Sequence, residues 1–269
     1  MTRWIEIAEG VYARRYAELD QTLGLVVGGE GCLVVDTGRD EAHGAELAAA
    51  VREVTPSPWA AMITHSHWDH FFGTASFTPC PVWAHERCRD VITDRADEMR
   101  ARGVGYFEAA GETDLATGVA AARTVVPTDV LTTTATIDLG GRSVVLRHPG
   151  RGHTDNDTVV HVPDTATVFA GDLVEQGAPP VIGGDAYPFE WPSTLATVLG
   201  LEPTVVVPGH GEPVGRDYVA RQREELAAVA GLVAAVAAGK LSLREAVSRS
   251  PYPPDATLPA LSRAQPATP

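Results

Sequence analysis

The sequence predicts an α/β protein with two groups of strands and with helices on the outside. Short apolar runs bounded by turn residues recur near the start of the chain and again after its middle, and stretches of helical composition alternate with them. The chain has 269 residues, 44% hydrophobic and 21% charged, which is enough for one large domain or two small ones around a sizeable core.

The first half of the chain predicts strands, one helix and a helical insertion. Strands are expected in the β-rich or apolar runs at 11–18, 23–27, 32–35, 59–63 and 82–84. Residues 41–54 have helical composition, and Pro56 and Pro58 end that stretch. Residues 86–102 carry charges at helical spacing, and the weaker pattern of 103–125 predicts a helical or irregular continuation. An insertion is therefore expected around 86–125.

The second half returns to strands. Two hairpin signals are present: runs 135–139 and 143–147 flank Gly140-Gly141, and runs 158–162 and 167–170 flank Pro163-Asp164. Helices are expected at 192–201 and 217–238, with a strand at 204–207. We expect residues 1–250 to form a single domain, and the Pro-rich tail, residues 251–269, to be extended or loosely ordered.

Charge and apolar patterning exclude several kinds of partner. The formal net charge is −14 and no Lys/Arg cluster is present, so we expect neither a nucleic-acid nor a membrane partner. The N-terminus lacks the apolar core of a secretory signal, and the apolar stretch 226–239 is shorter than the roughly 20 residues that cross a bilayer.

Cys32, Cys80 and Cys88 do not have metal-finger spacing and are expected to be small buried residues. A cytoplasmic protein with a small-molecule substrate is the expectation, and the oligomeric state is left open.

Three imidazoles and a carboxylate occur within residues 65–70, directly after an expected strand. His65, His67 and Asp69 alternate, so in an extended segment their side chains would face one side, and a turn would bring His70 beside them. Imidazole and carboxylate ligands together suit zinc, iron or manganese. This segment is therefore a candidate metal site.

Three further candidate ligands each follow an apolar β-run and adjoin a glycine. They are His153, Asp172 and His210. If these strand ends share one rim of the sheets, seven ligands converge there. The other four histidines are interpreted as ordinary core or surface residues, namely His43, His85, His148 and His161.

These residues resemble the metallo-β-lactamase superfamily. The match consists of His-x-His-x-Asp-His at 65–70, Gly-His-Thr at 152–154, Gly-Asp at 171–172 and Pro-Gly-His-Gly at 208–211, in an order and spacing that fit over about residues 5–220. The resemblance implies a four-layered αββα sandwich with metals at one edge. Val34-Val35-Asp36-Thr37-Gly38 also looks like a family element, in which Asp36 supports the site without binding metal.

The resemblance implies a role for each candidate ligand. The first metal would be held by His65, His67 and His153, and the second by Asp69, His70 and His210, with Asp172 between them. This full set is similar to the glyoxalase II and lactonase branches. Two divalent ions are implied, with zinc first and iron or manganese as alternatives.

One stretch, residues 148–175, looks closer to the zinc β-lactamases but departs from them at two positions. Those enzymes have a cysteine where Asp172 stands and often a lysine where Glu175 stands, and an exposed Glu175 would repel the carboxylate of the antibiotic. Around the site, Trp68, Glu175 and Tyr187 are the candidate substrate-binding residues, and residues 177–187 form a candidate substrate loop. Other candidate aromatic wall residues are Phe71, Phe72, Tyr106, Phe107, Phe189 and Trp191.

The predicted function is that of a dinuclear, zinc-dependent metallo-hydrolase. A metal-bridging hydroxide would attack a small-molecule ester, thioester, lactone or amide, and Asp69 would act in catalysis as well as bind metal. A nucleophilic serine or cysteine is disfavoured because neither type lies in an activating motif. The alternatives are an iron-dependent dioxygenase of a sulfur compound on the same fold and a weak β-lactam hydrolase. A nuclease is disfavoured by the acidic charge, and a binding protein without metals by the complete ligand set.

Overall fold

Two mixed sheets form the centre of the protein in the computed structural model, which describes residues 2–264. The first sheet has the order β1 (Arg3–Ala8), β2 (Val11–Arg15), β3 (Thr22–Val27), β4 (Cys32–Val35), β5 (Trp59–Met62), β6 (Val82–His85) and β7 (Asp129–Leu131). The second has the order β13 (Val214–Gly215), β12 (Val205–His210), β11 (Thr167–Glu175), β10 (Val159–Val162), β9 (Ser143–Arg147) and β8 (Thr134–Asp138). Strands β4 to β7 pair in parallel, as do β11 and β12.

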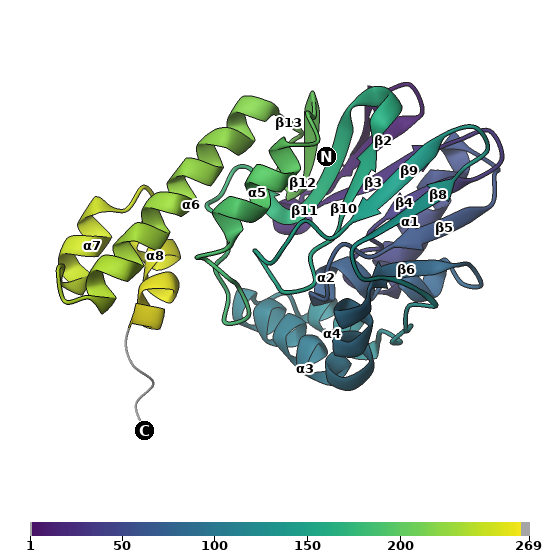
Figure 1. The fold of residues 1–269 in the computed structure, drawn as a ribbon. Coiled ribbons are helices and arrows are strands. Elements are labelled where there is room, and N and C mark those ends of the chain that lie inside the picture. Colours follow the sequence, from purple (N-terminus) through teal and green to yellow (C-terminus); the bar gives the residue numbers. More distant parts are fainter. Residues whose placement is uncertain (1, 265–269) are drawn as a thin grey trace.

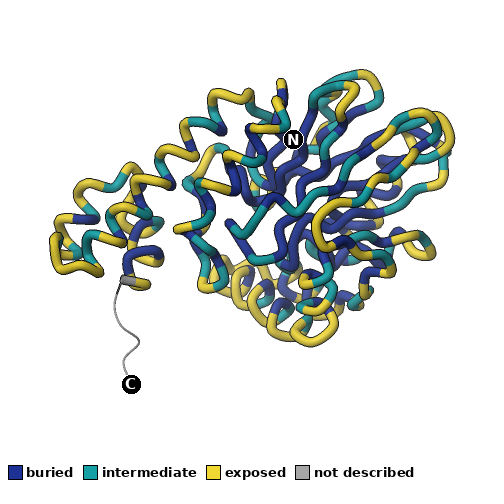
Figure 2. Tube along the Cα trace, in the orientation of Figure 1, coloured by how far each residue is buried: buried dark blue, intermediate teal, exposed yellow. Residues whose placement is uncertain are grey.

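The two sheets bury their apolar faces against each other (Figures 1 and 2). Leu33 and Met62 of the first sheet share a fully buried cluster with Leu146 and Val160 of the second. Gly24 in β3 lies so close to the second sheet that a Cβ there would come within 2.4 Å of the Phe169 ring. A larger residue at position 24 would therefore push the sheets apart.

Helices cover both outer faces of the sheet pair. Helices α1 (Glu41–Val54), α3 (Glu86–Ala110) and α4 (Thr113–Ala121) pack against the first sheet, and α5 (Trp191–Leu199) and α6 (Arg216–Ala237) against the second. Helices α7 (Leu243–Arg249) and α8 (Pro254–Leu261) pack around the far end of α6, beside the sandwich (Figure 1). The predicted αββα order of layers is confirmed.

Most expected elements are present, and the differences occur where local pattern is weak. The expected insertion at 86–125 consists of α3 and α4. Strands β1 and β7 were not predicted, and β11 continues past residue 170 to Glu175. The expectation of an extended tail is wrong for residues 254–261, which form α8 because Thr257, Ala260 and Leu261 are buried in the packing around α6. The rest of that expected tail, residues 265–269, lies outside the described residues.

Within residues 2–264, no helix is long and apolar enough to cross a membrane. Cys32 and Cys88 are buried and Cys80 is partly buried, and all three are free thiols, as expected of small packed residues.

Candidate metal centre

The segment that follows β5 supplies four of the predicted ligands. His65 and His67 lie in extended or bent backbone, as expected, but the alternation does not continue to Asp69. Residues Trp68–Phe71 form the single helical turn α2 instead, and this turn places Asp69 and His70 next to each other. Thr37 favours this turn from the neighbouring segment, because its amide and its hydroxyl both donate to the carbonyl of His70, at 2.9 and 3.1 Å.

Asp36, which directly follows β4, holds this segment in place through its carboxylate. Its carboxylate accepts hydrogen bonds from the amide and hydroxyl of Thr64, at 2.7 and 2.8 Å, and lies 2.8 Å from Nδ1 of His70. Asp36 is 1% exposed and takes a positive φ of 60°. The structure therefore places Asp36 behind His70, where the resemblance expected it.

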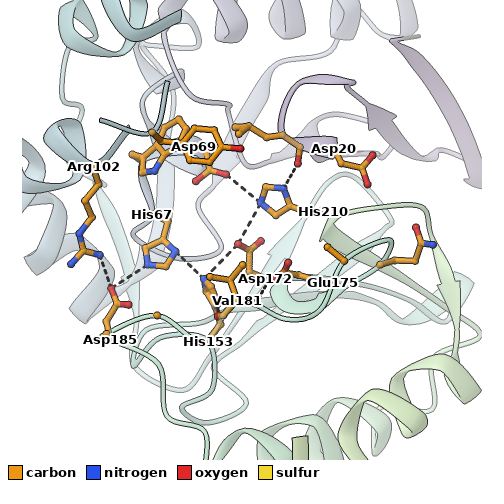
Figure 3. Close-up of a pocket in the computed structure, with 17 residues that line it drawn as sticks. Asp20, His67, Asp69, Arg102, His153, Asp172, Glu175, Val181, Asp185 and His210 are labelled. Carbon is orange, nitrogen blue, oxygen red and sulfur yellow. Dashed lines mark hydrogen bonds and ion pairs between the residues drawn. The ribbon is translucent and has the colours of Figure 1, made fainter. Parts of the chain in front are cut away.

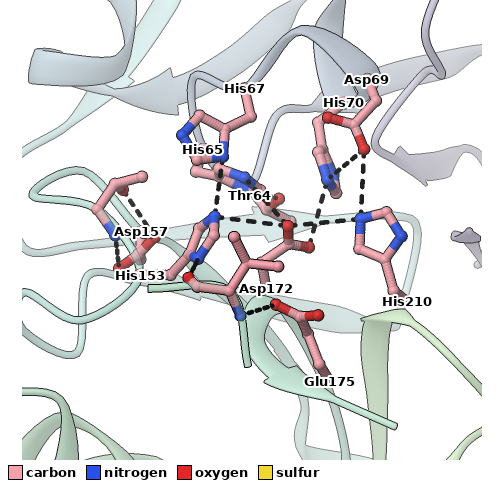
Figure 4. A network of polar contacts seen from close by, with 12 residues as sticks. Thr64, His65, His67, Asp69, His70, His153, Asp157, Asp172, Glu175 and His210 are labelled. Atoms are coloured by element: carbon pink, nitrogen blue, oxygen red, sulfur yellow. Dashed lines mark hydrogen bonds and ion pairs between the residues drawn. The ribbon is translucent and has the colours of Figure 1, made fainter. Parts of the chain in front are cut away.

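All seven predicted ligands meet at one edge of the sandwich, in two groups (Figure 4). The first group has His65, His67, His153 and Asp172, and the second has Asp69, His70 and His210. Within each group the candidate ligand atoms lie within 4.8 Å of one another. The loop after β9 delivers His153, a bulge at Gly171 in β11 delivers Asp172, and the end of β12 delivers His210.

Asp172 contacts both groups. Its Oδ2 lies 3.6 Å from Nε2 of His65 and 3.4 Å from Nε2 of His210, and its Oδ1 lies 3.3 Å from Nε2 of His70. A carboxylate within reach of imidazoles from both groups is the arrangement expected of a residue that joins two metal sites.

The buried polar atoms at this edge fit a metal better than they fit one another. Nε2 of His65, Nε2 of His70 and Oδ1 of Asp172 are buried and have no hydrogen-bond partner within the protein. Leaving such atoms unpaired costs about 1–3 kcal/mol each, so their presence together at this edge favours a bound ligand. Five imidazoles and two carboxylates suit zinc, iron or manganese.

The electrostatics of the two groups differ. Burial lowers the pKa of His153 to about 4 and holds the pKa of His65 well below its usual value. Burial is the largest influence on His70 and His210 and opposes their charge, but the carboxylates of Asp172 and Asp69 together outweigh it and hold both pKa values well above the usual range. Imidazoles must be neutral to bind a metal, so metal binding at the second group would release protons.

Each ligand imidazole is held from outside by a hydrogen bond to its second nitrogen. Nδ1 of His210 lies 2.7 Å from the carbonyl of Leu19, and Nδ1 of His153 lies 3.2 Å from the carbonyl of Val181. His67 is turned the other way: its Nδ1 faces the site, 2.8 Å from Nε2 of His153, and its Nε2 lies 3.2 Å from Oδ2 of Asp185. These contacts leave one nitrogen of each ring directed inward.

Two contacts at the site were not predicted from the sequence, although one of the residues, Asp185, lies in the expected substrate loop 177–187. Gln21 donates to the carbonyl of Asp69 at 2.7 Å and approaches its Oδ2 at 3.3 Å, and it is fully buried. Asp185 is 118 positions from its partner His67 along the chain. Neither lies in a motif, and a lone Gln or Asp next to loop residues carries no local signal of such a contact.

A cavity of about 510 Å³ opens onto the ligands (Figure 3). Two of the three candidate substrate-binding residues, Trp68 and Glu175, line it, together with Tyr106 and Val181, which are 54% and 58% exposed. Glu175 is only 4% exposed and its carboxylate accepts a hydrogen bond from the amide of Val181 at 2.9 Å. It therefore acts first as a support for the loop and not as an open negative charge.

The remaining predicted residues lie away from this cavity. Tyr187 is not among the lining residues, and its ring lies beneath the guanidinium of Arg151, 4.5 Å from the ring centroid. Three of the expected aromatic wall residues are fully buried core residues, namely Phe71, Phe72 and Trp191. His43 is also buried, at 5% exposure, and packs edge-on against Tyr16. The rings of His85 and His148 pack against each other at a tilt, with centroids 4.4 Å apart, outside the two ligand groups.

Comparisons with known proteins agree with this geometry. The family model of the metallo-beta-lactamase superfamily matches residues 18–210. A metallo-beta-lactamase type 2 of Bacillus cereus is 26% identical over 215 residues, which cover 78% of this chain and 73% of that protein. A linear primary-alkylsulfatase of a Pseudomonas strain is 24% identical over 220 residues, which cover 71% of this chain but 41% of that protein.

A solved structure supports the same fold. The metallo-beta-lactamase from Pontibacter korlensis superposes with a TM-score of 0.65 at 20% identity, covering 84% of this chain and 99% of that one. The family match spans most of the chain and ends on His210, and it includes all seven candidate ligands. The chain belongs to the metallo-beta-lactamase superfamily.

Proposed function

We propose that this protein is a dinuclear metal-dependent hydrolase that acts on a small-molecule ester, thioester, lactone or amide. The observation that carries the proposal is the position of Asp172, whose two oxygens reach imidazoles of both ligand groups. In this proposal His65, His67 and His153 hold one ion, Asp69, His70 and His210 hold the other, and Asp172 joins them. Zinc is the proposed metal, and iron and manganese suit the same donors.

The metal ions, when bound, would lower the pKa of a water molecule and polarise the carbonyl oxygen of the substrate. The protein's own residues prepare for this reaction. Asp69 lines the cavity, and Gln21 donates a hydrogen bond to its backbone carbonyl. This contact fixes the Asp69 carboxylate where it can accept a proton from an attacking water. The outer hydrogen bonds to His70 and His210 hold those rings in place, so the donor set needs little reorganisation.

The cavity wall supports a substrate with an apolar or aromatic part. Trp68 and Tyr106 lie with ring centroids 6.0 Å apart, and Leu19 and Val181 line the same cavity. An apolar group of the substrate that packs on these side chains would be removed from water, and this burial contributes about 25 cal/mol of binding free energy for each Å². A cavity of about 510 Å³ is in the range of small-molecule sites.

A second candidate function is hydrolysis of β-lactams, because the Bacillus cereus relative carries that name. The resemblance counts against efficient activity, since Asp172 stands in the place of a cysteine. Glu175, which stands in the place of a lysine, has its carboxylate occupied by the loop and offers no cation. An amide-hydrolysing activity toward these drugs is therefore expected to be weak.

A panel of hydrolase substrates tests the proposal. The protein would be prepared with zinc, manganese or iron and assayed against thioesters, lactones, esters, β-lactams and phosphodiesters, with oxygen uptake followed in the iron form. We expect hydrolysis of at least one carboxylic ester, thioester or lactone, lost with a chelator and regained with metal. Oxygen-dependent turnover of a sulfur compound by the iron form, with no hydrolysis by any form, would support the dioxygenase alternative instead.

A further inference from the structure

Loop 177–187 contacts two of the candidate metal-binding histidines from outside. The carbonyl of Val181 lies 3.2 Å from Nδ1 of His153, and Oδ2 of Asp185 lies 3.2 Å from Nε2 of His67. The loop is anchored by the Val181 amide, which donates to Glu175 at 2.9 Å. At the other end of the loop the amide of Tyr187 donates to the carbonyl of Gly152 at 2.7 Å. The loop therefore connects the cavity wall to the ligands.

Asp185 also joins the loop to the helical insertion. The guanidinium of Arg102, on α3, donates to the same Oδ2 of Asp185 at 3.2 Å (Figure 3). The side chains of Arg102 and Asp185 are 48% and 35% exposed, whereas that of His67 is 16% exposed. Arg102, Asp185 and His67 thus form a chain of contacts that runs from the surface to the ligands.

The orientation of His67 depends on this contact. A neutral imidazole carries one N–H and one lone pair, and a carboxylate can only accept a hydrogen bond. The contact with Asp185 therefore places the proton on Nε2 and the lone pair on Nδ1, the nitrogen that faces His153. The equivalent contact to His70 comes from Asp36, which is 1% exposed and held by Thr64. His67 is the member of the first group whose outside carboxylate is partly open to solvent.

We propose that Asp185 is a positioning residue that holds His67 with Nδ1 toward the metal, and that Arg102 keeps Asp185 in place. The proposal rests on the proposed function, in which His67 is a metal ligand. It assigns to the α3 insertion a role in the metal centre as well as in the cavity wall. Partners of this kind typically change metal affinity by 10- to 100-fold when they are removed.

The test compares three variants with matched controls. Asp185→Ala removes the carboxylate, Asp185→Asn keeps an acceptor oxygen for Nε2 but loses the charge that holds Arg102, and Arg102→Ala removes the guanidinium. Glu190→Ala is the control just after the loop, because Glu190 forms an ion pair with Arg151 at 2.6 Å and does not line the cavity. Arg89→Ala is the control on α3, because Arg89 pairs with the exposed Asp90 of the same helix at 3.2 Å.

The main measurement is zinc affinity, by competition with a chromophoric chelator, with the tautomer of His67 read from nitrogen chemical shifts of the zinc-loaded protein. We expect zinc at one of the two sites to dissociate 10- to 100-fold more readily from Asp185→Ala than from the wild type. Asp185→Asn and Arg102→Ala should fall between the two, and the controls should match the wild type. If Asp185 only stabilised the fold, its replacement would lower thermal stability without this graded loss of zinc affinity or a change in the His67 tautomer.

Two results would separate this inference from the function on which it rests. If the wild type binds two zinc ions and Asp185→Ala binds them with the same affinity and the same His67 tautomer, the positioning role is refuted and the hydrolase proposal stands. If the wild type binds no zinc, manganese or iron, the proposed function fails first. Equal losses in Asp185→Ala and Glu190→Ala would also refute the positioning role, because the effect would then belong to the region in general.

Discussion

Replacement of Gly209 by alanine tests whether the close contact between β12 and Asp172 sets the position of the joining carboxylate. A Cβ at residue 209 would lie 1.9 Å from Oδ1 of Asp172 and 3.0 Å from the backbone carbon of Gly171. Cβ atoms are essentially never closer than 3.0 Å to another heavy atom, so the carboxylate or the strand must retreat by about 1 Å. A misplacement of that size in a catalytic constellation costs about 100-fold in rate.

The assay for Gly209→Ala combines metal content with steady-state kinetics on the best substrate from the panel. We expect fewer than two ions per chain at a zinc concentration that saturates the wild type, and kcat reduced by about 100-fold. Gly231→Ala is the control, because the same added Cβ in α6 would meet nothing within 4 Å. In the double variant with Asp172→Ala the clash with the carboxylate oxygen is gone and only the tight backbone contacts at 3.0 and 3.1 Å remain, so Gly209→Ala should cost less stability there than in the wild type. Full metal content and unchanged kcat in Gly209→Ala would refute the reasoning.

Three further predictions follow from other parts of the structure. Trp68→Ala and Tyr106→Ala should raise KM for substrates with a large apolar group by severalfold and change kcat less; Phe189→Ala, an exposed aromatic outside the cavity, should leave both unchanged. Burial, together with the nearby charge of Arg39, lowers the pKa of His43 from 6.5 to about 3 in the folded protein. The stability that the neutral His43 side chain contributes is therefore complete above pH 6.5 and is lost as the pH falls toward 3. Urea unfolding at pH 6.5 and 5.5 should show the wild type losing about 1 kcal/mol more than His43→Gln, and equal losses would contradict this. Asp172→Ala should lose metal and activity, whereas exposed Glu98→Ala should lose neither.

The core of the site could be predicted from the sequence because its ligands lie where strands end. His153, Asp172 and His210 each follow or end an apolar run, and strand ends at one rim of a sheet pair meet in space. Local pattern was less successful at Asp69: alternation predicts an extended strand, but the hydrogen bonds between Thr37 and His70 favour a helical turn there. Such a contact joins segments far apart in the chain and leaves no periodic signal.

The cavity wall was harder to predict than the ligands. The aromatic residues near the motifs fall into two environments, the cavity wall and the hydrophobic core. Trp68 and Tyr106 line the cavity, whereas Phe71 and Trp191 are fully buried. The composition of a segment does not distinguish these two environments, because both favour large apolar side chains. His43 illustrates the same limit, since a lone histidine gives no sign of the Tyr16 ring that covers it.

Metal stoichiometry of the purified protein tests the central claim most directly. The protein would be stripped with a chelator, titrated with zinc and analysed for zinc and protein in the same fractions, with Asp172→Ala alongside. Two ions per chain for the wild type, and a clear loss in Asp172→Ala, are the predicted results, because Asp172 contacts both ligand groups. A folded wild type that takes up neither zinc nor manganese nor iron would contradict the account.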